Sequence, residues 1–302
     1  MYNLGIATVV DDTTQTNWSM EQFYELDSAL ISHFDAIINM CVIKDSIQKY
    51  GKTAQLKDLV GASVEAAGIT FSLEGLWQGI KDFFKWIWDK LKAMWNWFTG
   101  LFKSEKKKDD QAKAAIDEAA KKVASDGSGN QTVEIVNTAS IMAVADKTFG
   151  ILSSQKNTPP LTPKYIDSKS IEEVAALLEE KEKQKLNMDS AIEYFSKAAS
   201  VGKEKITTTK NKAIAEARNI LGTKVKLNTF MTVLSKQIVA LKNGVAEFSA
   251  ILKDDDTKDA SKLAVAVKVY KQDYSRVSSL TKAERSAAKK CYEGLLSITD
   301  AV

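Results

Sequence analysis

The side chains that most often do chemistry in proteins are scarce in this sequence. It has one histidine, His33, and two cysteines, Cys41 and Cys291. A histidine that acts as a base needs a nucleophile within hydrogen-bond reach. Cys41 lies eight residues further along the same expected helix, which is about 12 Å away. We therefore interpret His33 as a histidine at the edge of a core, and both cysteines as small buried hydrophobic residues.

Patterns for metal and cofactor binding are also absent from the sequence. One histidine and two widely separated cysteines form neither a multi-histidine metal site nor a zinc or disulfide framework. No phosphate-binding loop, dinucleotide-binding motif, zinc-binding helix motif or nucleophile elbow occurs. The stretch 126–130 lacks the ligands of a calcium loop and is interpreted as a hinge. We therefore predict a non-enzymatic protein with no catalytic residue, cofactor or metal; an enzyme with a dispersed active site is the alternative.

The most unusual feature is a tryptophan-rich segment. Five of the six tryptophans lie between positions 77 and 97. At about 100° per residue, a helix over 76–102 collects its large apolar side chains on one face and its charged side chains on the other. Full burial is worth about 1.5–3 kcal/mol for each such side chain, so the whole face carries as much as a domain's net stability. The residues expected to make this contact are Trp77, Ile80, Phe83, Phe84, Ile87, Trp88, Leu91, Trp95, Phe98 and Phe102.

Three ways of covering this face remain open: a core or oligomer contact within the protein, a membrane interface, and a groove on a different protein. A transmembrane span is disfavoured because Lys85, Asp89 and Lys92 interrupt the segment. An interfacial helix fits well, since lysines line the polar face and tryptophan suits a site that is apolar on one side and wet on the other.

Helix signals follow one another along most of the chain. Beyond a strand candidate at 4–10, helices are expected over about 20–50 and 53–67, from about 72 through the aromatic segment, and over about 133–149. The polar, alanine-rich stretch 103–125 has high helix propensity but almost no apolar face, a flexible break follows at 126–130, and the prolines of 159–163 mark a boundary. Capping boxes are expected at Ser19, Ser170 and Thr281, with an apolar helical stripe from Ile206 to Leu221. Apolar residues at steps of four and three, over 227–252 and 263–277, predict helices packed side by side within the chain.

We therefore predict an all-α protein in three parts: an N-terminal helical region, 1–103, with the aromatic amphipathic helix 76–102; a charged, flexible connector, 104–168, with a short helix; and a C-terminal multi-helix bundle, 169–302, with heptad-like packing. The 302 residues carry a net charge of +3 and few arginines, which argues against sequence-specific nucleic-acid recognition. The N-terminus lacks the basic stretch of a signal peptide, so synthesis in the cytoplasm is expected.

The run Phe83-Phe84-Lys85-Trp86-Ile87-Trp88 resembles amphipathic segments of tape-measure and internal or ejected virion proteins of tailed bacteriophages. The lysine-rich, arginine-poor helical remainder is similar to phage structural proteins generally. The resemblance implies a virion component, made in the host cytoplasm, whose partners are other subunits of the same or another kind, with a membrane surface as a further partner if the protein is ejected. The alternative is a helical, pore-forming toxin that inserts the aromatic helix.

Overall fold

The computed structural model describes residues 19–50, 73–154, 168–170, 172–180, 182–183, 204–252 and 260–302. These residues form long helices with one small sheet, which confirms the all-α fold class. The strand expected at 4–10 and the helix expected at 53–67 lie outside the described residues. The named elements are α1 (Met20–Tyr50), α3 (Leu73–Asp126), η1 (Ser128–Asn130), β1 (Thr132–Val136), α4 (Thr138–Ser154), β2 (Lys205–Thr209), α7 (Lys210–Ile251) and α8 (Ala260–Ala301).

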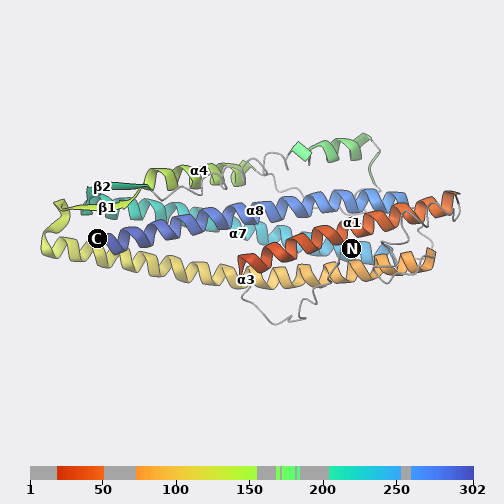
Figure 1. The fold of residues 1–302 in the computed structure, drawn as a ribbon, viewed down its shortest axis with the longest axis horizontal. Coiled ribbons are helices and arrows are strands. Elements are labelled where there is room, and N and C mark those ends of the chain that lie inside the picture. The colour runs from red at the N-terminus through yellow and green to blue at the C-terminus, as the bar shows by residue number, and fades with distance from the viewer. Residues whose placement is uncertain are drawn as a thin grey trace, which may run out of the picture.

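Four long helices pack side by side into an elongated bundle, and α3 is the longest at 54 residues (Figure 1). Neighbours in the order α1, α3, α7, α8 run antiparallel, which is up-down-up-down topology. The rings of Phe23 in α1 and Trp97 in α3 stack with centroids 5.0 Å apart, and those of Phe84 in α3 and Phe248 in α7 with centroids 4.8 Å apart. Tyr270 of α8 packs against Phe34 of α1 and Phe248 of α7, each with centroids 5.5 Å apart, so aromatic side chains join all four helices in the core.

The two ends of the bundle are built differently. At the end that contains α1, which we call the proximal end, α1 packs against α3 and α8 and completes a four-helix core. At the distal end, α4 instead packs on α7 and α8, where Phe149 meets Phe230 edge to face at 5.3 Å. Gly294 of α8 lets α4 approach closely, since a Cβ there would lie 2.7 Å from a methyl carbon of Ile141.

Two of the expected capping boxes are formed. The Ser19 hydroxyl accepts a hydrogen bond from the backbone N–H of Gln22, and the Gln22 side chain accepts one from the backbone N–H of Ser19. Ser170 and Glu173 make the same reciprocal pair at the start of the helical stretch 172–180. Both pairs satisfy backbone donors that a helix leaves free in its first turn.

The third expected box, at Thr281, is wrong. Thr281 lies in the middle of the continuous helix α8, and its hydroxyl donates to the carbonyl oxygen of Val277 one turn earlier. No glycine or proline stands near this position to end a helix. The capping pattern therefore occurs here inside a helix, where threonine bonds back to the preceding turn.

The boundary expected at residue 103 does not interrupt the chain either. Helix α3 runs through it to Asp126, and the lysine-rich half of α3 packs on α7 through the buried side chains of Ala112, Ile116 and Val123. The alanines and lysines of this half are strong helix formers, so three well-spaced apolar contacts suffice to hold it. The first part of the expected connector is thus an arm of the bundle.

The stretch 126–130, interpreted from the sequence as a flexible break, is a compact turn. The Asp126 carboxylate accepts a hydrogen bond from the backbone N–H of Ser128 at 2.8 Å, and Gly127 has a φ of 69°. Gly129 faces Asn211, whose side chain would lie 2.4 Å from an added Cβ. The left-handed backbone at Gly127 favours glycine there, and Gly129 leaves room for the Asn211 side chain.

The two strands were not expected from the sequence. Strands β1 and β2 pair antiparallel, with Ile135 opposite Ile206. The spacing of apolar residues had predicted helices at both places. The strands are instead rich in β-branched residues, Thr-Val-Glu-Ile-Val and Lys-Ile-Thr-Thr-Thr, which favour extended backbone.

The expected four-and-three spacing of α7 and α8 is confirmed as core. Along α7, every apolar residue of the repeat from Leu227 to Leu252 is buried. In α8, Leu263, Val267 and Val277 are buried in the same way. The hydroxyl of the buried Tyr270 in α8 donates to the carbonyl oxygen of Leu241 in α7, which fixes the register of the two helices.

Candidate interaction site on the aromatic helix

The structure places the ten expected contact residues of α3 in three environments. The central row is buried inside the protein, against α1, α7 and α8. Its members are Ile80, Phe84, Ile87, Leu91 and Phe98. Trp77, Phe83, Trp88 and Trp95 are half-buried at its edges, and Phe102 is 41% exposed. The chain's own core therefore covers the centre of the aromatic face, and only the edges remain for contact with anything else.

The edge toward α1 holds the single histidine. The imidazole of His33 lies flat on the indole of Trp86, with centroids 3.7 Å apart, and meets Phe83 edge to face at 5.0 Å. His33 Nδ1 donates to the carbonyl oxygen of Ala29 at 2.8 Å, as the neutral ring does when that nitrogen is protonated. Burial lowers the pKa of His33, and Lys90 lowers it further, against the hydrogen bond to Ala29. His33 is thus an interhelical packing residue, as expected.

Trp97 is not among the ten expected contact residues, but it is only 2% exposed. It stacks on Phe23 of α1 and packs edge to face against Phe98. The helical wheel assigned one apolar arc to α3, whereas α3 has two buried neighbours, α1 and α7. A helix that packs into a groove between two partners buries a wider arc than a helix on a flat surface.

Both edges of the aromatic face carry tryptophan together with lysine. The Lys242 ammonium of α7 lies 5.5 Å from the centroid of a Trp88 ring, and that of Lys44 in α1 lies 4.1 Å from a Trp77 ring. Such cation–π contacts contribute about 0.5–1 kcal/mol at exposed sites. They leave the indoles partly open to solvent, because a lysine stem covers a ring only in part.

A cluster of buried, charged side chains lies in the middle of the bundle. It was not expected from the sequence. We call it the ionic layer. Lys224 of α7 is fully buried, with its ammonium 2.9 Å from a Glu105 carboxylate oxygen and 2.5 Å from an Asp109 oxygen, both in α3. Asn228 of α7 also donates to Asp109, at 2.7 Å. From α8, Arg285 joins the same group.

The Arg285 guanidinium links all three helices of the ionic layer. It donates to both carboxylate oxygens of its neighbour Glu284, at 2.5 and 2.6 Å, and to the side-chain oxygen of Asn228 at 3.1 Å. Its distance to Glu105 is 3.3 Å. Burial alone would raise the pKa of Glu105, but Arg285, Lys108 and Lys224 lower it to about 2. Burial raises the pKa of Glu284, although Arg285 opposes it.

A signal for the ionic layer was present in the sequence. Glu105 lies seven residues after the buried Phe98, Lys224 lies seven before the buried Met231, and Glu284 lies seven after the buried Val277. Each charge therefore falls on a core position of its own helix. Every one of these residues has a partner of opposite charge, as buried charges require. The layer acts as structure: it fixes the register of α3, α7 and α8.

The potentially reactive groups elsewhere are inert. Cys41 and Cys291 are buried, and burial raises the pKa of each thiol to about 12, which leaves no thiolate at neutral pH. Among the residues that the structure describes, no group of histidine, cysteine and acidic side chains is arranged to hold a metal ion. Neither cysteine therefore acts as a nucleophile, and the described residues offer no metal site.

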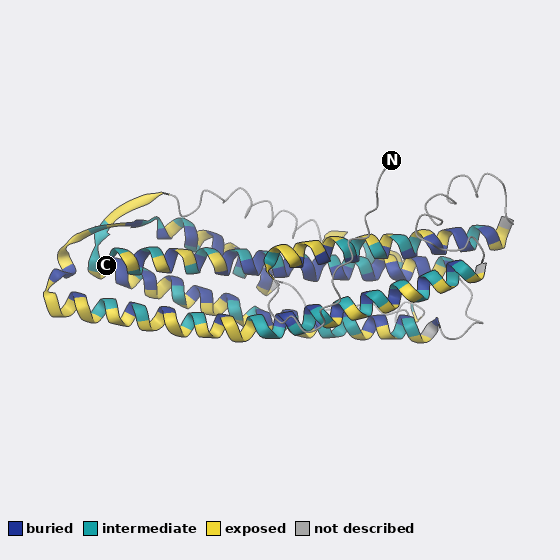
Figure 2. Cartoon of the chain, turned by 60° about the horizontal axis from the view of Figure 1, so that its bottom comes forward, coloured by how far each residue is buried: buried dark blue, intermediate teal, exposed yellow. Residues whose placement is uncertain are grey.

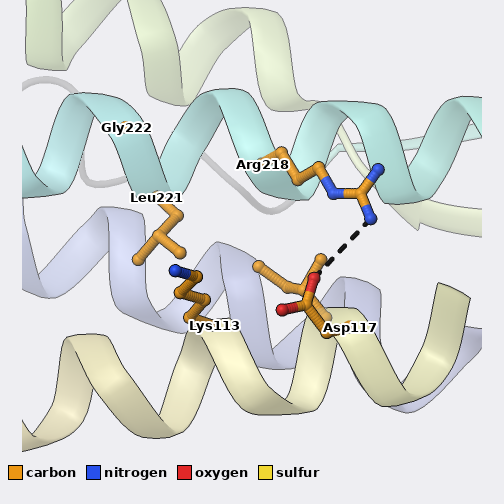
Figure 3. A pocket seen from close by; sticks show the side chains of 6 residues that line it. Lys113, Asp117, Arg218, Leu221 and Gly222 are labelled. Carbon is orange, nitrogen blue, oxygen red and sulfur yellow. Dashed lines mark ion pairs between the residues drawn. The ribbon is translucent and has the colours of Figure 1, made fainter.

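A surface hollow of about 270 Å³ lies between the distal halves of α3 and α7 (Figure 3). Lys113 and Asp117 of α3 line it together with Arg218 and Leu221 of α7. The Arg218 guanidinium reaches across to the Asp117 carboxylate at 3.7 Å, and both side chains are about half exposed. The lining offers a solvated ion pair, the Lys113 ammonium and aliphatic carbon.

Within the described residues, one helix has the length and composition of a membrane span. It is the segment Met20–Lys49 of α1, with a mean hydropathy of 1.4 over its best window. Here this helix is part of the bundle, with Phe23, Leu30, Phe34 and Ile37 completely buried. Core helices have the same composition, so this property alone does not separate the two roles.

Comparison of the chain with protein-family models, with curated proteins and with solved structures finds no match. The interpretation of the site therefore depends on its geometry. That geometry is an elongated rod with an inert interior and a row of half-buried tryptophans along its longest helix.

Proposed function

We propose that this chain is a non-enzymatic structural and interaction protein, a component of a bacteriophage virion that contacts a membrane surface or neighbouring subunits through the outer edge of α3. One observation carries the proposal: Trp88, Trp95 and Phe102 remain half-buried or exposed along a helix whose central face is already used by the core. A folded chain that keeps large aromatic side chains at its surface offers them to a partner.

The shape supports a structural role. Helix α3 has 54 residues, which corresponds to about 81 Å at 1.5 Å per residue. The aromatic contacts at the proximal end and the ionic layer in the middle hold the helices in one register along this length. A rod of this kind suits a role as a spacer or scaffold in an assembly, where its sides present repeated contact surfaces.

Light scattering over a wide range of protein concentrations tests the structural role. A virion subunit is expected to associate with itself or with a co-expressed neighbour, so the measured mass should rise with concentration. A mass that stays at the monomer value, alone and with the products of adjacent genes, would argue strongly against the proposal. The nature of those genes is a second test, because capsid, portal or tail genes are expected beside a virion component.

A second candidate function is a membrane-active toxin that opens and inserts its aromatic helix. The observation in its favour is α1, which has the hydropathy of a membrane span and covers the aromatic face of α3. Release of dye from lipid vesicles at nanomolar protein would support this candidate. Binding to vesicles without leakage would instead favour the structural role.

A further inference from the structure

One surface combines the exposed aromatic edge of α3 with lysines of α3 and α7. We call it the α3/α7 seam, formed by Trp88, Trp95 and Phe102 of α3 with Val225 and Val239 of α7. Contacts with α7 fix the direction in which the α3 residues face. Trp88 lies under Lys242 of α7, and Asp109 is bonded to Lys224 and Asn228 of α7.

Because residues seven apart share one side of a packed helix, Trp95 and Phe102 lie in the same row as Trp88 and Asp109, along the border with α7. The apolar side chains of the seam are partly open to solvent. Phe102 is 41% and Val225 45% exposed, and Trp88, Trp95 and Val239 are half-buried. Figure 2 shows α3 along the edge of the bundle, with half-buried and exposed residues on its outward side. The seam is thus a strip of partly exposed apolar side chains.

Lysines predominate beside this strip, although Asp89, next to Trp88, is also exposed. Lys85, Lys92 and Lys106 are exposed and lie three residues before Trp88, three before Trp95 and four after Phe102. Lys236 and Lys242 add further positive charge from α7, a helix with seven lysine or arginine residues against two glutamates. Asp109, the acid in the aromatic row itself, is already neutralised by Lys224.

Helix α1 differs in sign from α7. It has five acidic residues against two lysines, and Glu21 and Glu25 are exposed. Asp35 of α1 is paired with Lys271 of α8, and α8 itself has more basic than acidic residues. An anionic plane attracts a basic, aromatic border such as that of α3 and α7.

We infer that the α3/α7 seam binds the surface of an anionic lipid bilayer while the bundle stays closed, an inference that rests on the interaction role proposed above for α3. Tryptophan rings at the border between apolar and wet surroundings match the headgroup region, and lysines beside them match anionic headgroups. The row from Lys85 to Lys106 spans 21 residues, about 32 Å of helix that can lie along a bilayer. Arginine, which a nucleic-acid surface favours, is absent from this row.

Flotation of the full chain with vesicles tests the inference. The wild type is expected to float with vesicles of phosphatidylglycerol and phosphatidylcholine, and to remain behind with phosphatidylcholine alone. The triple variant Lys85→Glu, Lys92→Glu, Lys106→Glu should bind the anionic vesicles at least about a hundredfold more weakly, since each lysine near an anionic surface contributes about a fivefold effect. All three side chains are exposed, so the circular dichroism spectrum should not change.

The matched control changes the same charge away from the seam: Lys121→Glu, Lys122→Glu, Lys289→Glu, which are also exposed. This control is expected to keep vesicle binding close to the wild-type level. Equal loss of binding in both variants would overturn the seam as the binding surface. Binding of the wild type to a DNA oligonucleotide through the seam lysines, without binding to vesicles, would overturn the choice of lipid.

A fluorescence measurement separates a closed from an opened bundle. Brominated lipids quench tryptophans that reach the bilayer, so quenching should fall in the variant Trp88→Phe, Trp95→Phe and stay in the control Trp86→Phe, Trp97→Phe. Loss of quenching in the control instead would mean that α1 leaves α3, and would overturn docking of the closed bundle. If the chain self-associates but binds no vesicles, this inference fails while the proposed structural function stands.

Discussion

The ammonium of Lys224 lies 2.9 Å from the carboxylate of Glu105, although neither side chain has appreciable access to solvent. The pair joins α7 to α3, 119 residues apart in sequence. Its two charges would be strongly destabilising if either stood alone, because each has given up its hydration. The ionic layer is therefore a point at which single substitutions have large effects.

Lys224→Met is expected to destabilise the protein by about 3–5 kcal/mol, because it leaves Glu105 and Asp109 buried with too little positive charge. Urea unfolding followed by circular dichroism measures this change. The double variant Lys224→Met, Glu105→Leu should be more stable than the single one. Lys226→Met, at an exposed position of the same helix, is the control and should change stability little. A Lys224→Met variant as stable as that control would contradict the role of the layer.

Acid should unfold the protein partly through Glu105. Its pKa falls from 4.5 in the unfolded chain to about 2 in the folded protein, so the folded state favours its ionised form. This contribution to stability is present above pH 4.5 and is lost as the pH falls toward 2. It amounts to at most about 3 kcal/mol.

Glu284 has the opposite sign, because burial raises its pKa and its protonation at low pH relieves a cost. Glu105→Gln should therefore flatten the rise of the unfolding free energy with pH between pH 2 and 4.5. Glu284→Gln should act above pH 4.5, where it removes the loss of stability that occurs as the pH rises through the raised pKa of Glu284. Equal slopes in both variants and the wild type would show that other carboxylates govern acid unfolding.

His33 should make the contact between α1 and α3 sensitive to mild acid. Its pKa lies below the ordinary 6.5 in the folded protein, chiefly because burial disfavours the charged ring. The stabilisation that comes from the neutral ring is present above pH 6.5 and is lost as the pH falls through the lowered value. Nuclear magnetic resonance titration of the ring measures that value directly. In His33→Phe, which keeps an aromatic ring against Trp86, the change in stability across this pH range should disappear.

Two lysine substitutions on α3 separate the core row from the edge. Phe84→Lys places a charge at a position only 1% exposed, between α3 and Phe248 of α7, and should prevent folding of the proximal end. Trp88→Lys places the charge at a half-buried position where it can reach solvent, so the fold should survive with a loss of about 1–3 kcal/mol. Thermal unfolding monitored by circular dichroism compares the two. If both variants unfold alike, the edge of α3 is as much core as its centre.

Local sequence determined most of the helices. The capping boxes at Ser19 and Ser170 and the four-and-three spacing from Leu227 to Leu252 depend on residues close together in the chain. Such patterns act within one or two turns, so they can be followed without the rest of the molecule. For the same reason, the amphipathic character of 76–102 was evident. The β-strands were missed because their pairing joins residues more than 70 positions apart, Val133 with Thr208 and Glu134 with Thr207.

Only the tertiary structure decided what covers the aromatic helix. The pattern of α3 required that its aromatic face be buried. Whether this chain, a partner or a lipid covers that face depended on whether α1, α7 and α8 pack around α3. These three helices bury Phe84 and Trp97 and leave Trp88 partly exposed. It also brings Glu105, Lys224 and Arg285 from three helices into one layer, where charges on core positions compensate one another. A charge at a core position is destabilising in a single helix, and it becomes part of the fold only when the partner helices supply its opposite.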